Sequence, residues 1–368
     1  MTTIYSTEME NIYRPEILNL KSSKDNARYE ALLGADPNIF IFDTIEAQLR
    51  ELIKVRHPDQ NPSEDEYVAL IQRQLKGENV REYGVWVYFA WSRRIVHVLP
   101  EEEFIEVRTN RNQLKITREE QLLLKEKIVG VIGLSVGQSI ALTIAMERVC
   151  GTIRLADYDF VELSNLNRIR TGIHNLDVSK VVIAAREIAE IDPFMHVEVF
   201  RDGLNMQNME DFISGKRKLD VMVEVCDNLE IKLKSRIAAR AHGVPVVMET
   251  NDRCMLDIER FDLDPNRPIL HGLVSSQDVE NIADLPGKER LNLVLKIVDG
   301  DQLSDRMKQS FGEIGTTLRA WPQLASSVTL GGGITTEVVR KVLLNENIES
   351  GRCYFDVEQI LLEKTQYK

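Results

Sequence analysis

The sequence predicts an α/β fold in which a doubly wound, mostly parallel sheet carries helices on both faces, with a smaller α+β domain before it. Two observations support this prediction. Over residues 127–250, short apolar segments alternate with amphipathic segments, and this alternation is typical of successive βαβ units. Residues 1–107 lack it and are richer in aromatic residues. We therefore expect domains at residues 1–107 and 108–345, followed by a C-terminal tail at 346–368.

The N-terminal domain is expected to hold two helices and a pair of strands. Residues 42–55 and 65–75 place apolar residues at helical spacing. The run at 83–100 is aromatic and β-branched, which predicts two strands that turn at Ser92–Arg94. We expect Trp86, Tyr88 and Trp91 to belong to a core rather than to a ligand site.

The second domain should supply most of the sheet. In parallel sheets ligands bind beyond the carboxyl ends of the strands, so functional residues are expected directly after each strand. Residues 326–344 should form a Gly-rich entry to a helix near the C-terminal end of the domain. The glycines at 331–333 are expected to permit close helix packing rather than to form a second phosphate cradle. Strands are predicted at 128–132, 152–156, 196–200, 221–226 and 244–249, and helices at 117–126, 139–149, 179–191 and 229–242.

Composition restricts the class of protein. The chain has 368 residues, of which 43% are hydrophobic and 28% charged, as in soluble globular proteins. Its net charge of −12 disfavours nucleic acid as a partner, because phosphate binding calls for excess Lys and Arg. The acidic residues near the N-terminus argue against a signal peptide, and no apolar run is long enough for a membrane span. The cytoplasm is the expected location.

The cysteines are not arranged for a metal or a disulfide framework. Cys150, Cys226, Cys254 and Cys353 lie far apart, and none forms a C-x-x-C pair. We therefore expect no structural zinc.

A glycine turn follows the first predicted strand. Gly133, Ser135 and Gly137 stand where the chain passes from strand to helix. Glycines let the backbone turn tightly and approach a phosphate, which would sit at the helix N-terminus. The spacing is one residue shorter than G-x-G-x-x-G and the middle glycine is missing. A tight turn that binds no ligand is therefore the alternative.

Acidic and basic residues follow the later strands. Asp157 ends the second strand and could hold ribose hydroxyls, or be a plain surface acid. Asn165 and Arg168 come next. Asn165 could fix a phosphate or a loop, and the guanidinium of Arg168 offers a planar fork to phosphate oxygens. Lys180 precedes a helix and could neutralise a triphosphate, or be a solvated charge. Asp227 is a candidate Mg²⁺ ligand, although it could instead cap the following helix.

Together these residues resemble the ThiF/MoeB/HesA superfamily, the bacterial relatives of the ubiquitin-activating enzymes, over residues 108–344. The likeness depends on an acid followed by SNLNR at 164–168, the spacing to the lysine, and a strand that ends in CDN at 226–228. It implies a Rossmann-like ATP-binding domain. It also implies that Asp157 binds ribose, Asn165 and Arg168 contact phosphates, Lys180 promotes adenylation, and Asp227 positions Mg²⁺.

The resemblance also implies a homodimer. In the family, an arginine near the start of the domain reaches into the partner subunit's ATP site, and Arg111 matches it loosely. The implied reaction joins a carboxylate to the α-phosphorus of ATP with release of pyrophosphate. The carboxylate is often the C-terminal glycine of a ubiquitin-like or sulfur-carrier protein, or belongs to a peptide.

The sequence departs from the family in its shortened glycine turn, in the missing C-x-x-C pairs and in the absence of a cysteine from residues 273–297. Cys254 comes too early and Cys353 too late for the thioester position. We therefore expect a divergent, zinc-free adenylyltransferase with no thioester step.

Three other functions remain open to different degrees. The chain could activate a tRNA-linked carboxylate, which its acidic charge disfavours. It could be a nucleotide-binding scaffold that has lost catalysis, which the missing glycine favours. A dehydrogenase is disfavoured because it would leave Asn165, Arg168, Lys180 and Asp227 unexplained.

Overall fold

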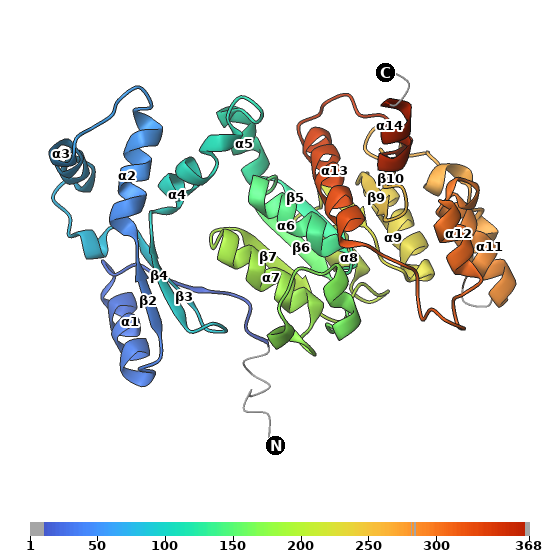
Figure 1. The fold of residues 1–368 in the computed structure, drawn as a ribbon, viewed down its shortest axis with the longest axis horizontal. Helices are drawn as coiled ribbons and strands as arrows, with labels where there is room; N and C mark the ends of the chain where they lie inside the picture. The colour runs from blue at the N-terminus through green and yellow to red at the C-terminus, as the bar shows by residue number, and fades with distance from the viewer. Residues whose placement is uncertain (1–10, 281, 283–284, 365–368) are drawn as a thin grey trace. The chain divides into compact units, whose positions relative to one another are not determined.

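The computed structural model describes residues 11–280, 282 and 285–364 (Figure 1). The chain divides into two compact units, one of residues 1–119 and 188–195 and the other of residues 120–187 and 196–368. Each unit has its own sheet. None of the described helices is both long and apolar enough to cross a membrane.

The first unit contains a four-stranded sheet of order β1-β3-β4-β2. The two predicted strands are present as an antiparallel pair, and Trp86 packs edge-on against Tyr29 in the core. The helix predicted from residue 42 begins at Ile45 instead, because the residues before it pair in parallel with β4. Its elements are β1 (Glu16–Leu18), α1 (Ser23–Ala35), β2 (Phe40–Asp43), α2 (Ile45–Arg56), α3 (Glu64–Leu75), β3 (Val85–Phe89), β4 (Arg94–Val98) and α4 (Glu101–Arg108).

The second unit contains a seven-stranded sheet of order β11-β10-β9-β8-β5-β6-β7. The five strands from β9 to β7 are parallel, and β10 and β11 are antiparallel additions at one edge. The strands are β5 (Ile128–Ile132), β6 (Thr152–Ala156), β7 (His196–Phe200), β8 (Val221–Glu224), β9 (Val246–Thr250), β10 (Met255–Glu259) and β11 (Gly351–Tyr354). The predicted α/β class with a mostly parallel sheet is confirmed. β11 comes from the segment that the sequence set apart as a tail.

Helices cover both faces of this sheet (Figure 1). On one face, Gly130 of β5 leaves room for Phe212 of α8, and α9 packs into the same core. On the other face, Val131 of β5 meets Gly137 at the start of α6, and α13 lies beside α6. The helices are α5 (Arg118–Lys125), α6 (Gly137–Glu147), α7 (Lys180–Ile191), α8 (Met209–Ile213), α9 (Leu229–Ala241), α10 (Ser276–Glu280), α11 (Gly287–Ile297), α12 (Asp305–Phe311), α13 (Ala325–Leu343) and α14 (Val357–Lys364).

The glycine run at 331–333 lies inside α13 and not in a loop before it, which corrects the predicted Gly-rich entry. The reason is packing. A Cβ on Gly332 would lie 2.5 Å from Ser139 Oγ of α6, and a Cβ on Gly331 would lie 2.5 Å from Glu249 Cδ of β9. The glycines therefore let the helix approach α6 and the sheet, as the close-packing interpretation expected.

Candidate active site

The turn after β5 brings the backbone of two neighbouring strands together. Gly133 has φ +86°, in the left-handed region, and an added Cβ would lie 2.8 Å from Cys226 Cα. Any other residue would be strained and would clash with the chain that follows β8. The turn leads to α6, whose first N–H groups receive no side-chain cap. Such a helix start is suited to an anion.

Asp157, at the end of β6, fixes this turn. Its carboxylate accepts hydrogen bonds from the backbone N–H of Leu134 (2.6 Å) and of Asp159 (2.7 Å). The side chain is buried, and burial raises its pKa. Each carboxylate oxygen has a second lone pair that could still accept from a ribose hydroxyl.

Two cations lie around the same turn. Arg168 donates from Nε to Ser135 Oγ at 3.0 Å. Its pKa is lowered by burial, an effect that the nearby Asp227 carboxylate partly offsets. Lys180 is buried at the start of α7 and its Nζ lies 2.8 Å from Asp159 Oδ2. Charged nitrogen donors held beside an uncapped helix N-terminus are a suitable environment for a polyphosphate.

Asp227 is exposed at the carboxyl end of β8. Its neighbour Asn228 is the N-cap of α9, where its side chain accepts from Ile231 N at 3.1 Å. Because Asn228 provides the cap, the Asp227 carboxylate is available for another role. Carboxylate oxygen is a ligand that Mg²⁺ prefers, so the residue type fits the predicted metal.

A pocket at this edge of the sheet brings several predicted residues together. Gly133, Ser135, Asp157 and Asp227 line it, and Arg168 and Lys180 bond to two of its lining residues. Other residues without a role predicted from the sequence also line it, among them Tyr158, Asp159 and Gly203. Proximity to Asp157 in the sequence is the signal that could have identified Asp159.

Besides Arg168 and Lys180, three further predicted residues do not line this pocket. Asn165 turns its Oδ1 back onto Glu162 N at 3.2 Å, so it braces its own loop. Gly137 packs against Val131 of β5. Arg111 is exposed in a short 3₁₀ helix at 110–112 of the first unit.

A second pocket adjoins the first. It has a volume of about 180 Å³ and shares Val225, Cys226 and Asp227 with the first pocket. Its other walls come from the end of β9, from α11 and α12, and from residues 321–323. Glu249 lines it as well; this residue is only 4% exposed, and burial raises its pKa to about 8. This pocket could not be identified from the sequence, since its walls are far apart in the chain.

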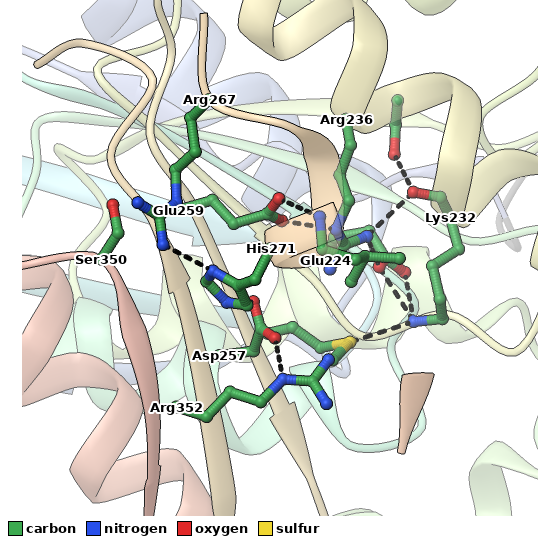
Figure 2. A network of polar contacts seen from close by, with 12 residues as sticks. Glu224, Lys232, Arg236, Asp257, Glu259, Arg267, His271, Ser350 and Arg352 are labelled. Carbon is green, nitrogen blue, oxygen red and sulfur yellow. Dashed lines mark hydrogen bonds and ion pairs between the residues drawn. The ribbon is translucent and has the colours of Figure 1, made fainter. Parts of the chain in front are cut away.

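Lys232, which lines the second pocket, belongs to a buried network of ions that we call the 224–236–259 network (Figure 2). Arg236 of α9 donates to Glu224 of β8 and, from Nε at 2.7 Å, to Glu259 of β10; all three side chains are fully buried. Lys232 adds a contact of 2.9 Å to Glu224. Burial raises the pKa of Glu224, but Lys232 and Arg236 outweigh it and lower the pKa to about 2. The network joins α9 to two strands.

The thiols are not activated. Burial raises the pKa of Cys150 and of Cys254 to about 12, and also raises those of Cys226 and Cys353. A thiol needs a lowered pKa to act as a nucleophile at neutral pH. Within the described residues, no cluster of three His, Cys, Asp or Glu side chains is placed to hold a metal ion.

Comparison with known proteins gives a family match. Residues 109–314 match the sequence model of the ThiF family. An uncharacterized protein of Mycobacterium tuberculosis is 45% identical over 332 residues, which cover 89% of this chain and 43% of that protein. The Saccharomyces cerevisiae protein named tRNA threonylcarbamoyladenosine dehydratase 2 is 28% identical over 149 residues, which cover 40% of this chain and 33% of the relative. This chain thus spans less than half the length of these curated relatives.

Among solved structures, Escherichia coli MccB, crystallised with ATP, is 14% identical and has a TM-score of 0.47. The match covers 83% of this chain and 83% of that one.

Proposed function

The chain belongs to the ThiF family, and we propose that it is an ATP- and Mg²⁺-dependent adenylyltransferase that activates a carboxylate without a thioester step. The observation that carries the proposal is the grouping of Arg168, Lys180 and Asp227 around the glycine turn at one edge of the sheet. A dehydrogenase pocket has no use for two cations at this point, whereas a triphosphate does.

The proposed reaction joins two anions. An oxygen of the substrate carboxylate forms a bond to the α-phosphorus of ATP, and the bond from that phosphorus to the bridging oxygen of pyrophosphate breaks. The carboxylate is already ionised at neutral pH, so no general base is needed. The protein's part is to bring the anions together and to screen their repulsion.

Each residue has a distinct part in this proposal. Asp157 holds the turn and accepts from the ribose, and Arg168 and Lys180 neutralise phosphate oxygens. Asp227 is the residue that would hold Mg²⁺, which supplies positive charge to the triphosphate and eases the departure of pyrophosphate. The raised thiol pKa values support the absence of a cysteine intermediate. Asn165 acts through the loop that carries Arg168.

The test is exchange of labelled pyrophosphate into ATP, with amino acids and with Gly-Gly-ended peptides as carboxylates. We expect Asp227→Asn to lower the exchange rate about 10²-fold, because the metal loses its anionic ligand. The matched control is Asp264→Asn, which changes an exposed acid of the same unit and should leave the rate unchanged. Undiminished exchange in Asp227→Asn would refute the metal role.

Calorimetry with ATP·Mg²⁺ tests the proposal before any carboxylate is known. If the chain failed to bind at millimolar ligand, the enzymatic proposal would be wrong. Binding without exchange for any carboxylate would favour the scaffold alternative. The yeast relative is named for a tRNA nucleoside, which keeps a tRNA-linked carboxylate as a second candidate, although the net charge of −12 favours a small molecule or a peptide.

A homodimer is the remaining part of the proposal. Arg111 is exposed, as a residue that enters a partner's ATP site must be in the isolated subunit. We expect sedimentation velocity to give a mass near twice 42.1 kDa, and mixtures of inactive Arg111→Ala and Asp227→Asn chains to recover exchange. A monomer at micromolar concentration would contradict both expectations.

A further inference from the structure

The pocket beside the nucleotide site contains a buried carboxylate that nothing in the described residues satisfies. Glu249 is 4% exposed, and neither Oε1 nor Oε2 has a hydrogen-bond partner among the described residues. Thr250 Oγ1 and Asn251 Oδ1, the next residues along the same wall, are buried and unsatisfied as well. Leaving buried polar groups unpaired is costly, so each such group calls for an explanation such as a functional role or a bound ion.

The surroundings of Glu249 keep it unpaired. Gly331 of α13 passes directly over it, since a Cβ there would lie 2.5 Å from Glu249 Oε1. Lys232 is the cation of the pocket lining, but its Nζ lies 2.9 Å from Glu224 in the 224–236–259 network. No protein cation on this wall is therefore left to neutralise the carboxylate.

Acidic side chains outnumber basic ones in the lining of the pocket. Its lining contains Asp227, Glu249 and Asp252 against the already paired Lys232. Asp252 accepts hydrogen bonds from Ser304 N (2.8 Å) and Ser304 Oγ (2.7 Å), which hold it in place without adding charge. Acidic side chains in a recess that partly excludes water attract a cationic group, such as an ammonium with N–H donors.

The opposite wall is apolar. Val294 and Ile297 of α11, Phe311 of α12 and Trp321 form much of it. The volume of about 180 Å³ is close to the roughly 150 Å³ of a protein cavity that takes up benzene. The pocket therefore fits one residue-sized group that joins an apolar body to a positively charged nitrogen.

We propose that this pocket binds the substrate through a protonated amine held by Glu249, so that the activated molecule is an amino acid or a short amine-bearing compound. The inference rests on the proposed function, in which Asp227, a residue common to both pockets, would hold the Mg²⁺ of the ATP whose α-phosphorus the substrate's carboxylate attacks. The inference favours a carboxylate that also bears an amine, rather than the Gly-Gly end of a carrier protein, as the substrate.

The ionisation of Glu249 gives the binding a pH dependence. The ionisable groups that share its surroundings are Asp227, Lys232, Asp252 and the neutral Cys254 thiol. Burial raises the pKa of Glu249 to about 8. At neutral pH the Glu249 carboxyl group must therefore lose its proton before it can pair with a protonated amine. Affinity should rise about tenfold per pH unit below pH 8.

The experiment uses the full chain without ATP and two probes of equal shape. Calorimetry at pH 7.5 compares 2-phenylethylamine, which is protonated, with 2-phenylethanol, which is neutral. We expect the amine to bind at least tenfold more tightly and Glu249→Gln to remove that preference. Glu230→Gln, at a partly exposed acid of α9, is the matched control and should retain it.

Equal affinity for the two probes, no detectable amine binding at millimolar concentration, or an unchanged preference in Glu249→Gln would each overturn the inference. The titrations need no nucleotide. Binding of the amine without binding of ATP·Mg²⁺ would therefore refute only the proposed function. Binding of ATP·Mg²⁺ without binding of the amine would refute only the proposed substrate class.

Discussion

Replacing Arg236 by Met is expected to destabilise the second unit by about 3–5 kcal/mol, the usual cost of removing one partner from a buried ion pair. Arg236 donates to Glu224 and to Glu259, and all three side chains are fully buried. Without the guanidinium, Glu224 keeps Lys232 as a counter-ion, but Glu259 loses its cation. Urea unfolding followed by circular dichroism measures the loss.

A second variant on the same helix gives the control. Lys234 of α9 pairs with Glu230 at 2.6 Å, and both side chains are about a third exposed. Lys234→Met should cost less than about 1 kcal/mol, as is usual for exposed pairs. Equal losses in the two variants would contradict the structural role given to the 224–236–259 network.

Replacing Glu249 by Gln is expected to stabilise the chain, by an amount that grows with pH. The folded pKa of Glu249, about 8, lies above the ordinary value of 4.5. Folding therefore takes up a proton between these values, and the free energy of unfolding falls by about 1.4 kcal/mol per pH unit. Below pH 4.5 both states are protonated, and above pH 8 both are ionised, so the loss is confined to that window.

Gln resembles the neutral form of Glu in shape and cannot ionise. The free energy of unfolding of the Gln variant therefore does not fall as this carboxyl group ionises. We expect Glu249→Gln to match the parent chain at pH 4.5 and to exceed it by about 3 kcal/mol at pH 7–8. Urea unfolding at both pH values measures the difference. A difference that did not change with pH would mean that Glu249 is paired in solution. A carboxylate kept at such a cost is typical of binding sites, where stability is given up for function.

The parallel part of the sheet could be predicted from the sequence because its strands are short, apolar or alternating segments that separate amphipathic helices. The strands at 128–132, 152–156 and 196–200 have the predicted bounds. The antiparallel edge could not be placed so well, because Asp257 and Glu259 of β10 suggest an exposed face although both are buried. Their partners Arg236 and Arg352 come from other elements, and one sequence does not reveal such long-range pairing.

The pocket beside the glycine turn was largely predictable and its neighbour was not. Gly133, Asp157, Arg168, Lys180 and Asp227 each follow a strand or begin a helix, and a parallel sheet brings such positions to one edge. The second pocket is built from β9, α11, α12 and residues 321–323. Glu249 looks in the sequence like the polar end of a strand, and only the passage of α13 over it makes it a buried, unpaired acid.

Three consecutive glycines in the middle of α13 have a consequence for how the chain folds. Each glycine costs a helix about 1 kcal/mol relative to alanine, so α13 has little tendency to form by itself. Its close approach to Ser139 and Glu249 compensates for that weakness, and those contacts join segments far apart in the sequence. Such contacts carry a large loop-closure entropy and form slowly. The helix is therefore expected to dock late in folding, so that Glu249 stays hydrated until the rest of the sheet has assembled.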